Sequence, residues 1–363
     1  MNNGEAKNNV GNISYQCPSC GGNMSYDPVK SALYCSYCES TVNIDQIQST
    51  EEYDFAEGLK TDSTWESGKI IFHCEFCGAD NIKDKNDLAS KCPFCGSDSV
   101  IELDELPGIK PHRVIPFKIS KSEAYGSFQK KLKKSFFAPK DLKKNFKETS
   151  INGIFLPSWT YDAGCFTIYD GVLGKHYTRT VGSGKNRRTV TETRYFPISG
   201  QRNFIFDDVL VTSGKALREE QVRGIFPYNT NNSLVYDEAY LAGYNAEHYS
   251  VNLKEGWFAA RKKTEEEMRS KILNSYNHDV VRYFNMKPTY SNIKYKYVLL
   301  PIWVSYYKYK DKTYYFLVNG ETGKVGGKTP VSGIKVAILV LMILVIAALI
   351  LLLIYNGETT YYY

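Results

Sequence analysis

Two groups of four cysteines with the same spacing constrain this chain more than any other feature. The groups are Cys17, Cys20, Cys35 and Cys38, followed by Cys74, Cys77, Cys92 and Cys95. In each group 14 residues separate two C-x-x-C pairs, and every cysteine of the second group lies 57 residues after its counterpart. The pattern indicates an internal duplication of one small metal-binding unit.

The chemistry of this pattern favours zinc. Two cysteines in a tight turn can face one ion, and two such knuckles complete a tetrahedral site. Thiolate tetrahedra select zinc or iron, so we expect two zinc ions, with rubredoxin-like iron as the alternative. Two disulfides per unit are disfavoured, because no N-terminal signal peptide is seen and a reduced cytosol keeps thiols free. A closed four-cysteine site is structural, and units this short need their metal to fold.

A second constraint is an apolar run at the other end of the chain. Val336 to Ile354 is an uninterrupted stretch of 19 apolar residues. At 1.5 Å per residue it spans about 30 Å, the hydrocarbon thickness of a bilayer. We therefore predict a transmembrane helix over residues 334–355 and a short tail over 356–363. A buried core helix is disfavoured, because no helical face of the run is polar.

Charges around this run predict its orientation. Three lysines precede it, and Glu358 alone is charged after it. The positive-inside rule then keeps the N-terminal bulk in the cytoplasm of a single-pass cell-membrane protein. Tyr355 and residues 361–363 would be aromatic anchors at the far interface.

The net charge of +6 hides an uneven distribution. Residues 1–104 hold 7 lysines, no arginine and 17 acidic residues, a net charge of −10, which leaves +16 for the remainder. An acidic module repels a phosphate backbone, so nucleic acid is disfavoured as its partner and protein is favoured. Seven aromatic rings could contact that partner or fill the small cores: Tyr15, Tyr26, Tyr34, Tyr37, Phe72, Phe76 and Phe94.

The chain is predicted to be an α+β multidomain protein. Zinc ribbons over 13–46 and 70–104 would flank an acidic linker, 47–69, with one short helix, and a β-rich α+β domain would cover 112–330. Helices are expected at 121–137 and 255–275. Strands are expected at 154–169, 175–181, 189–196, 203–210, 297–309 and 314–318, with a turn at Asp170-Gly171 and a basic hairpin tip at 182–188.

No catalytic constellation is recognisable, so an enzyme is not expected. The five histidines show no metal spacing, and no complete phosphate loop or G-x-S-x-G elbow is present. Asp207 and Asp208 would point to opposite faces of a strand and could not share a metal. Cys165, the ninth cysteine, lies in an apolar run and is expected to be a buried, inert thiol.

Two segments leave alternatives open. Leu156-Pro-Ser-Trp159 resembles Leu300-Pro-Ile-Trp303, 144 residues later, which indicates either a duplicated subdomain or two strands that start alike. Residues 129–147 hold eight lysines and one aspartate. They would contact an anionic leaflet, or form an amphipathic helix that packs its phenylalanine face on the sheet. Both hold if the lysines face lipid.

The ordered set of motifs is similar to a bacterial family of TFIIB-type zinc-ribbon membrane proteins, often labelled primosomal protein N′ or helicase-like. Besides the cysteines, the set comprises the segments at 114–117, 136–139, 156–159, 206–210 and 318–323. The resemblance covers about residues 15–330, implies metal-ligand roles for the eight cysteines and implies no helicase. It links some relatives to phage-shock (PspA-like) and SPFH (flotillin-like) envelope-stress proteins.

Together these features predict a membrane-anchored zinc-ribbon adaptor. It would recruit cytosolic or peripheral proteins to the membrane, in contact with membrane lipid. The alternative is a membrane-tethered nucleic-acid-binding protein that uses the basic domain and the hairpin tip at 182–188.

Overall fold

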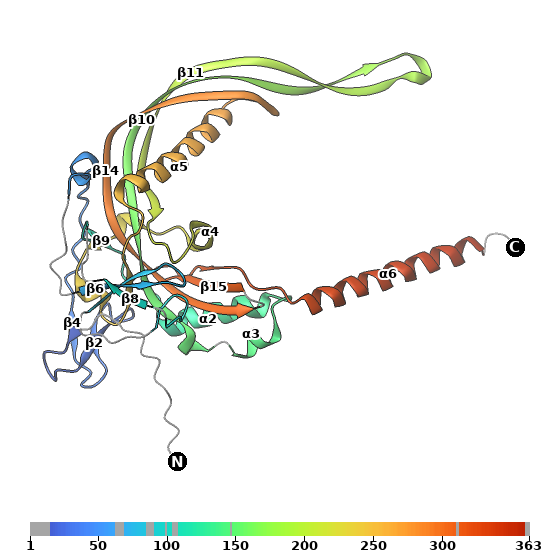
Figure 1. Ribbon diagram of the computed structural model, residues 1–363. Helices are drawn as coiled ribbons and strands as arrows, with labels where there is room; N and C mark the ends of the chain where they lie inside the picture. The colour runs from blue at the N-terminus through green and yellow to red at the C-terminus, as the bar shows by residue number, and fades with distance from the viewer. Residues whose placement is uncertain are drawn as a thin grey trace.

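The computed structural model shows a β-rich body with two projections, a long arm of strands and the C-terminal helix (Figure 1). The structure describes residues 15–61, 69–84, 91–98, 100–103, 108–145, 147–309 and 312–359. Part of the predicted linker, 62–68, and the predicted anchors at 361–363 lie outside these residues, as does the side chain of Tyr355.

The first cysteine unit, residues 15–46, has a sheet of its own. Each strand pairs antiparallel with the next: β1 (Tyr15–Gln16), β2 (Asn23–Asp27), β3 (Ala32–Cys35) and β4 (Thr41–Asn43). Side chains of β2 alternate between buried and exposed, as expected for a strand with one covered face. The unit docks on the body where the Tyr26 amide donates to the Ala242 carbonyl, 2.9 Å away.

All remaining strands form one twelve-stranded sheet. Its main path is β12-β9-β14-β10-β13-β7-β6-β8. The path strands are β6 (Lys69–Cys74), β7 (Asp80–Asp84), β8 (Val100–Leu103), β9 (Arg113–Val114), β10 (Asn152–Val181), β12 (Leu234–Val235), β13 (Asn245–Glu247) and β14 (Val280–Tyr309). Paired at its sides are β5 (Tyr53–Asp54), β11 (Arg188–Thr212), β15 (Lys312–Asn319) and β16 (Val325–Gly326). The second cysteine unit, 69–103, therefore belongs to the body, because β7 pairs with β13.

Two strands of 30 residues each, β10 and β14, form the spine of this sheet. The expected turn at Asp170-Gly171 is wrong, because β10 continues through it and pairs on both sides. Gly171 serves a close approach instead: a Cβ there would lie 2.8 Å from the Tyr283 carbonyl oxygen. The hairpin at 175–196 is confirmed, as is the pairing of the strand at 314–318 with β14. The first half of β14 is a strand that the sequence pattern did not predict.

Helices cover parts of the sheet. They are α1 (Phe55–Gly58), α2 (Lys121–Lys134), α3 (Lys140–Asn145), α4 (Glu219–Val222), α5 (Leu253–Leu273) and α6 (Gly333–Thr359), with 3-10 turns at Glu148–Ser150, Gly184–Asn186, Arg223–Ile225, Thr230–Asn232 and Glu238–Leu241. Both predicted body helices are confirmed within a few residues. Each begins at a capping box, Ser120 with Glu123 for α2 and Asn252 with Glu255 for α5.

The two L-P-x-W segments form the centre of a structural repeat. They lie on neighbouring antiparallel strands, with Leu156 directly opposite Leu300. One residue before each leucine, Phe155 pairs with the parallel strand β13 and Leu299 pairs with the parallel strand β9. The two strands thus have matching neighbours, as a local twofold arrangement requires.

Hydrogen bonds of the two indoles complete the repeat. The Trp159 Nε1–H donates to the Val251 carbonyl at 2.9 Å, and the Trp303 Nε1–H donates to the Ile119 carbonyl at 2.8 Å. Each acceptor lies one residue before the cap of a helix, α5 and α2 respectively. The helices are exchanged between the two halves of the repeat. Helix α2 precedes β10 in the chain but packs on β15, the partner of β14, whereas α5 precedes β14 but packs on β11, the partner of β10. Of the two alternatives left open by the sequence, this arrangement favours the duplicated subdomain.

The described part of the linker is fastened to the body. Its β5 pairs with β14, and α1 is the short helix that was expected there. The buried Arg113 guanidinium donates to the Ser49 hydroxyl at 2.7 Å and to the Glu51 carbonyl at 3.0 Å. A buried guanidinium needs such partners, so these bonds fix the path of the linker.

The C-terminal helix α6 leaves the body as a single rod (Figure 1). Its segment Gly333–Leu352 is long and apolar enough to cross a membrane, and none of it is buried inside the protein.

Candidate metal centres

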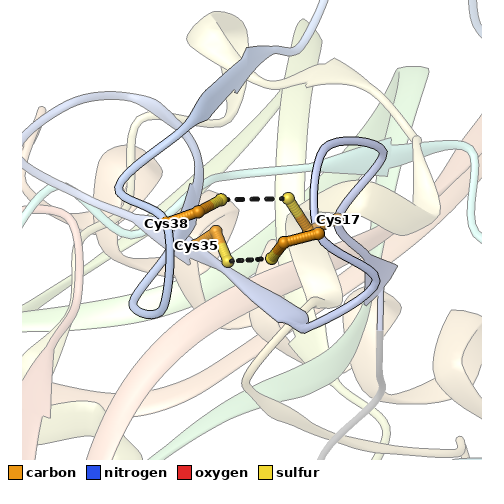
Figure 2. Close-up of side chains that lie close together, drawn as sticks. Cys17, Cys35 and Cys38 are labelled. Carbon is orange, nitrogen blue, oxygen red and sulfur yellow. Dashed lines mark hydrogen bonds between the residues drawn. The ribbon is translucent and has the colours of Figure 1, made fainter.

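The first centre gathers four thiols at the edge of the small sheet (Figure 2). The Sγ atoms of Cys17 and Cys38 lie 3.6 Å apart, as do those of Cys20 and Cys35. A disulfide would need about 2.05 Å, so all four are free thiols. Zinc–sulfur bonds of about 2.3 Å in a tetrahedron place the sulfurs about 3.8 Å apart. The observed spacing therefore fits one tetrahedral ion.

The second centre has the same spacing and is more deeply buried. Sγ atoms of Cys74 and Cys95 lie 3.6 Å apart, and so do those of Cys77 and Cys92. In this centre only Cys77 is partly exposed, whereas two cysteines of the first centre are exposed. Asn81 is buried, and its Nδ2 lies 4.0 Å from the Cys92 sulfur. The predicted ligands are thus brought together in two separate sets, each able to hold a metal ion.

One backbone turn recurs in all four knuckles. The amide four residues after the leading cysteine donates to that cysteine's carbonyl, at 2.8 or 2.9 Å. This closure requires a positive φ at the donor residue, which is Gly21 (73°), Glu39 (61°), Gly78 (74°) or Gly96 (71°). Glycine fills three of the four positions because it has no Cβ to strain there. The turn aims both thiols of a knuckle at one point.

The charge state of the thiols favours a bound cation in both centres. The Ser40 Oγ lies 3.1 Å from both the Cys17 and the Cys38 sulfur, and this hydrogen bond lowers the pKa of Cys17 to about 6. In the second centre the hydrogen bond between the Cys77 and Cys92 sulfurs raises the pKa of Cys77, because it stabilises the protonated form of that thiol. Four bare thiols therefore do not ionise together, whereas a divalent ion stabilises all four thiolates.

Two knuckle glycines allow a matched test of this geometry. Gly21 and Gly96 have nearly the same φ, but a Cβ at Gly96 would lie 1.7 Å from the Tyr306 hydroxyl oxygen, while one at Gly21 meets nothing within 4 Å. Gly21→Ala is expected to cost only the backbone strain, about 1–2 kcal/mol. Gly96→Ala should cost clearly more, because Tyr306 must move as well. Thermal unfolding and zinc release to a chelator would measure both, and equal effects would contradict the close approach of Tyr306 to Gly96.

The duplicated units differ in one aromatic position. Tyr37 lies inside the second knuckle of the first unit and is 78% exposed, whereas its counterpart Phe94 is 0% exposed. Phe94 is buried in a cluster that includes Ile302 and Leu317 of the body. The same knuckle residue therefore fills the core in one unit and is available for contacts in the other.

Cys165 lies on β10 and is buried, as predicted. Burial raises the pKa of its thiol, which keeps it protonated and unreactive.

The expectation for Asp207 and Asp208 is wrong. A bulge in β11 and a φ of 49° at Asp208 bring both side chains toward one cluster. Carboxylate oxygens of Asp207, Asp162 and Glu52 lie within 4.8 Å of one another. The Lys296 Nζ lies 2.7 Å from Asp208, 3.5 Å from Glu52 and 3.9 Å from Asp162, so an ammonium group supplies the positive charge. No sequence motif links Glu52 to Lys296, since only tertiary pairing joins them.

The fold and the cysteine clusters define a β-rich protein with two four-cysteine sites, each able to hold a metal ion, and one apolar C-terminal helix. The chain belongs to the family of YdjG from Bacillus subtilis (strain 168), which is described as an uncharacterized protein. The two are 31% identical over 332 residues, covering 90% of this chain and 92% of YdjG. No family model and no solved structure matches the chain. The TFIIB-type assignment of the cysteine units stays a prediction.

Proposed function

We propose that this protein is a membrane-anchored adaptor that recruits cytosolic or peripheral proteins through its first cysteine unit. In this proposal both centres are TFIIB-type zinc ribbons, each holding one zinc ion, and α6 crosses the membrane with the body in the cytoplasm. The observation that carries the proposal is the exposed Tyr37, whose counterpart Phe94 is buried.

The surface around Tyr37 has the character of a protein-binding site. Tyrosine in the middle of an exposed patch is a frequent hot spot of protein interfaces. The first unit holds three acidic residues and one lysine: Asp27, Glu39, Asp45 and Lys30. A zinc tetrathiolate adds a charge of about −2 to it. The partner is therefore expected to present a basic surface. By the resemblance, PspA-like and flotillin-like envelope-stress proteins are the first candidates to test.

Replacing Tyr37 tests recruitment. Tyr37→Ser is expected to weaken partner binding about 30-fold, the loss of a hot spot of about 2 kcal/mol. Phe76→Ser is the matched control, because Phe76 is also an exposed knuckle ring but belongs to the second unit. Photocrosslinkers placed around position 37 capture partners in intact cells. The affinity of each variant for each captured protein is then measured. Equal losses for both variants would refute the assignment to Tyr37.

The membrane part of the proposal has a separate test. A spanning helix stays in vesicles during carbonate extraction, whereas a peripheral protein is released. Full-length protein should remain in the membrane fraction, and a chain that ends at residue 332 should not. Release of the full-length protein would refute anchoring by α6.

The arm favours a second candidate function, nucleic-acid binding. Its end, 175–181 with 188–194, is two-stranded and projects from the body (Figure 1). Exposed cations there are Arg179, Lys185, Arg187, Arg188 and Arg194, of which Arg179 pairs with Glu192 at 2.6 Å. Gel shifts of full-length protein in detergent at low and moderate salt would reveal phosphate binding. Absence of a shift at low salt would eliminate this function.

A further inference from the structure

The turn between α2 and α3 is fastened to the beginning of α6. The Ser332 amide donates to the Phe137 carbonyl at 2.8 Å. The Lys335 ammonium donates to the Phe136 carbonyl at 2.8 Å and to the Ala138 carbonyl at 2.6 Å. These three bonds place the turn at the point where α6 leaves the body. We call residues 130–140 and 332–335 the neck.

Phe136, an aromatic residue of the neck, is not part of the core. Phe136 is 65% exposed, and its ring packs edge-on against Phe137, with centroids 5.3 Å apart. The apolar face of α2 is already used, because Phe128 and Leu132 are buried and Phe128 packs against Phe316 of β15. The alternative of an amphipathic helix with a phenylalanine face on the sheet holds only in part, because α2 ends at Lys134, Leu132 is buried and Phe136 is exposed. Phe136 lies beyond it, beside the first turn of the apolar helix.

Positive charge surrounds this ring. The exposed lysines of the neck are Lys130, Lys133, Lys134 and Lys140, and none of them has an ion pair within the described part of the chain. Asp141 is the nearest acidic residue in sequence and is also exposed. Lys131 differs, since its ammonium donates to the carbonyls of residues 326 and 327, each 2.9 Å away. The four lysines without an ion pair thus lie within six residues of Phe136 in the sequence.

We propose that the neck is a second membrane contact, in which Phe136 enters the headgroup region and the lysines bind anionic phospholipid headgroups. The inference rests on the proposed function, because α6 must cross the bilayer to bring the neck to the surface. Phenylalanine beside lysines is the composition of interfacial segments, and each lysine near an anionic leaflet strengthens binding about fivefold. The contact would fix the orientation of the body, and so the height at which Tyr37 meets its partner.

Amide hydrogen exchange of the full-length protein in nanodiscs tests this contact. The discs hold phosphatidylcholine alone or phosphatidylcholine with phosphatidylglycerol. We expect exchange at residues 136–140 to slow in the anionic discs only. A triple variant, Lys130→Gln with Lys133→Gln and Lys134→Gln, should weaken the contact on the order of 100-fold and abolish that difference. Phe136→Ser should reduce the protection while leaving its dependence on anionic lipid.

A matched control carries the same change of charge elsewhere. Lys254, Lys262 and Lys287 are exposed on α5 and β14, and their replacement by glutamine should leave the protection at 136–140 unchanged. Equal exchange in both kinds of disc, or an equal loss in the control, would overturn the inference. So would the same protection caused by duplex DNA added to neutral discs, which would assign the neck to nucleic acid. Failure to enter neutral discs at all would instead refute anchoring by α6.

Discussion

Cys77→Ser is expected to unfold the whole β-rich body, whereas Cys20→Ser should disrupt only the first cysteine unit. The two cysteines hold the same position in the duplicated units. A structural zinc site contributes about 10–16 kcal/mol to the free energy of folding, which is as large as the whole free energy of unfolding of a typical domain. We therefore expect a unit whose site lacks one thiolate to unfold. In the second unit this loss reaches the body directly, because β7 pairs with β13 and Phe94 is buried among body residues.

The first unit is joined to the body by side-chain packing, in a hydrophobic cluster that includes Tyr26 and Tyr240, and its described strands do not pair with the body sheet. Its sheet is separate, and Tyr26 docks through its amide on Ala242 and through its carbonyl on the Tyr244 hydroxyl. Limited proteolysis of the full-length protein in detergent, read by mass spectrometry together with zinc content, distinguishes the outcomes. Cys77→Ser should expose cleavage sites across 112–330, and Cys20→Ser should expose them only before residue 47. Similar patterns for both variants would mean that the two units are equally independent.

Lys296→Met is expected to lower the free energy of unfolding by about 3–5 kcal/mol, because it leaves buried carboxylates without their cation. The Lys296 side chain is 10% exposed and faces Asp208, Asp162 and Glu52. Lys294→Met is the matched control: this lysine also contacts Glu52, at 3.5 Å, but its side chain is 51% exposed. An exposed pair contributes about 1 kcal/mol or less, so the control should lose little.

The free energy of unfolding that Lys296→Met loses should also depend on pH. Burial raises the pKa of Asp162 to about 7. A carboxyl whose pKa is higher in the folded state stabilises the fold below its unfolded pKa of about 4, and this contribution is lost as pH rises through 7. Without Lys296 that pKa rises further, so the deficit of Lys296→Met should be larger at about pH 8 than at about pH 5. Urea unfolding at both pH values measures it, and a deficit no larger than that of Lys294→Met would contradict the burial of the cluster.

Local sequence patterns predicted most helices and strands of the body, and the main wrong prediction was a turn at one pair of residues. Asp170-Gly171 has the composition of a turn, but it lies inside a strand because β10 and β14 approach too closely for a side chain at Gly171. The first half of β14 was missed because its residues are mostly polar or half exposed and gain strand structure from pairing with β10. The repeat centred on Leu156 and Leu300 left only a faint trace in the sequence, the two L-P-x-W segments.

The sequence by itself determined the two metal-ligand sets and the apolar helix. Both depend on properties of short segments: the C-x-x-C spacing that fits one ion, and a run long enough for a bilayer. Only the tertiary structure decided that the second cysteine unit is part of the body, that Tyr37 is exposed while Phe94 is not, and that the neck adjoins α6. These features depend on which distant strands pair and what they cover, and residue spacing along the chain carries little of that information.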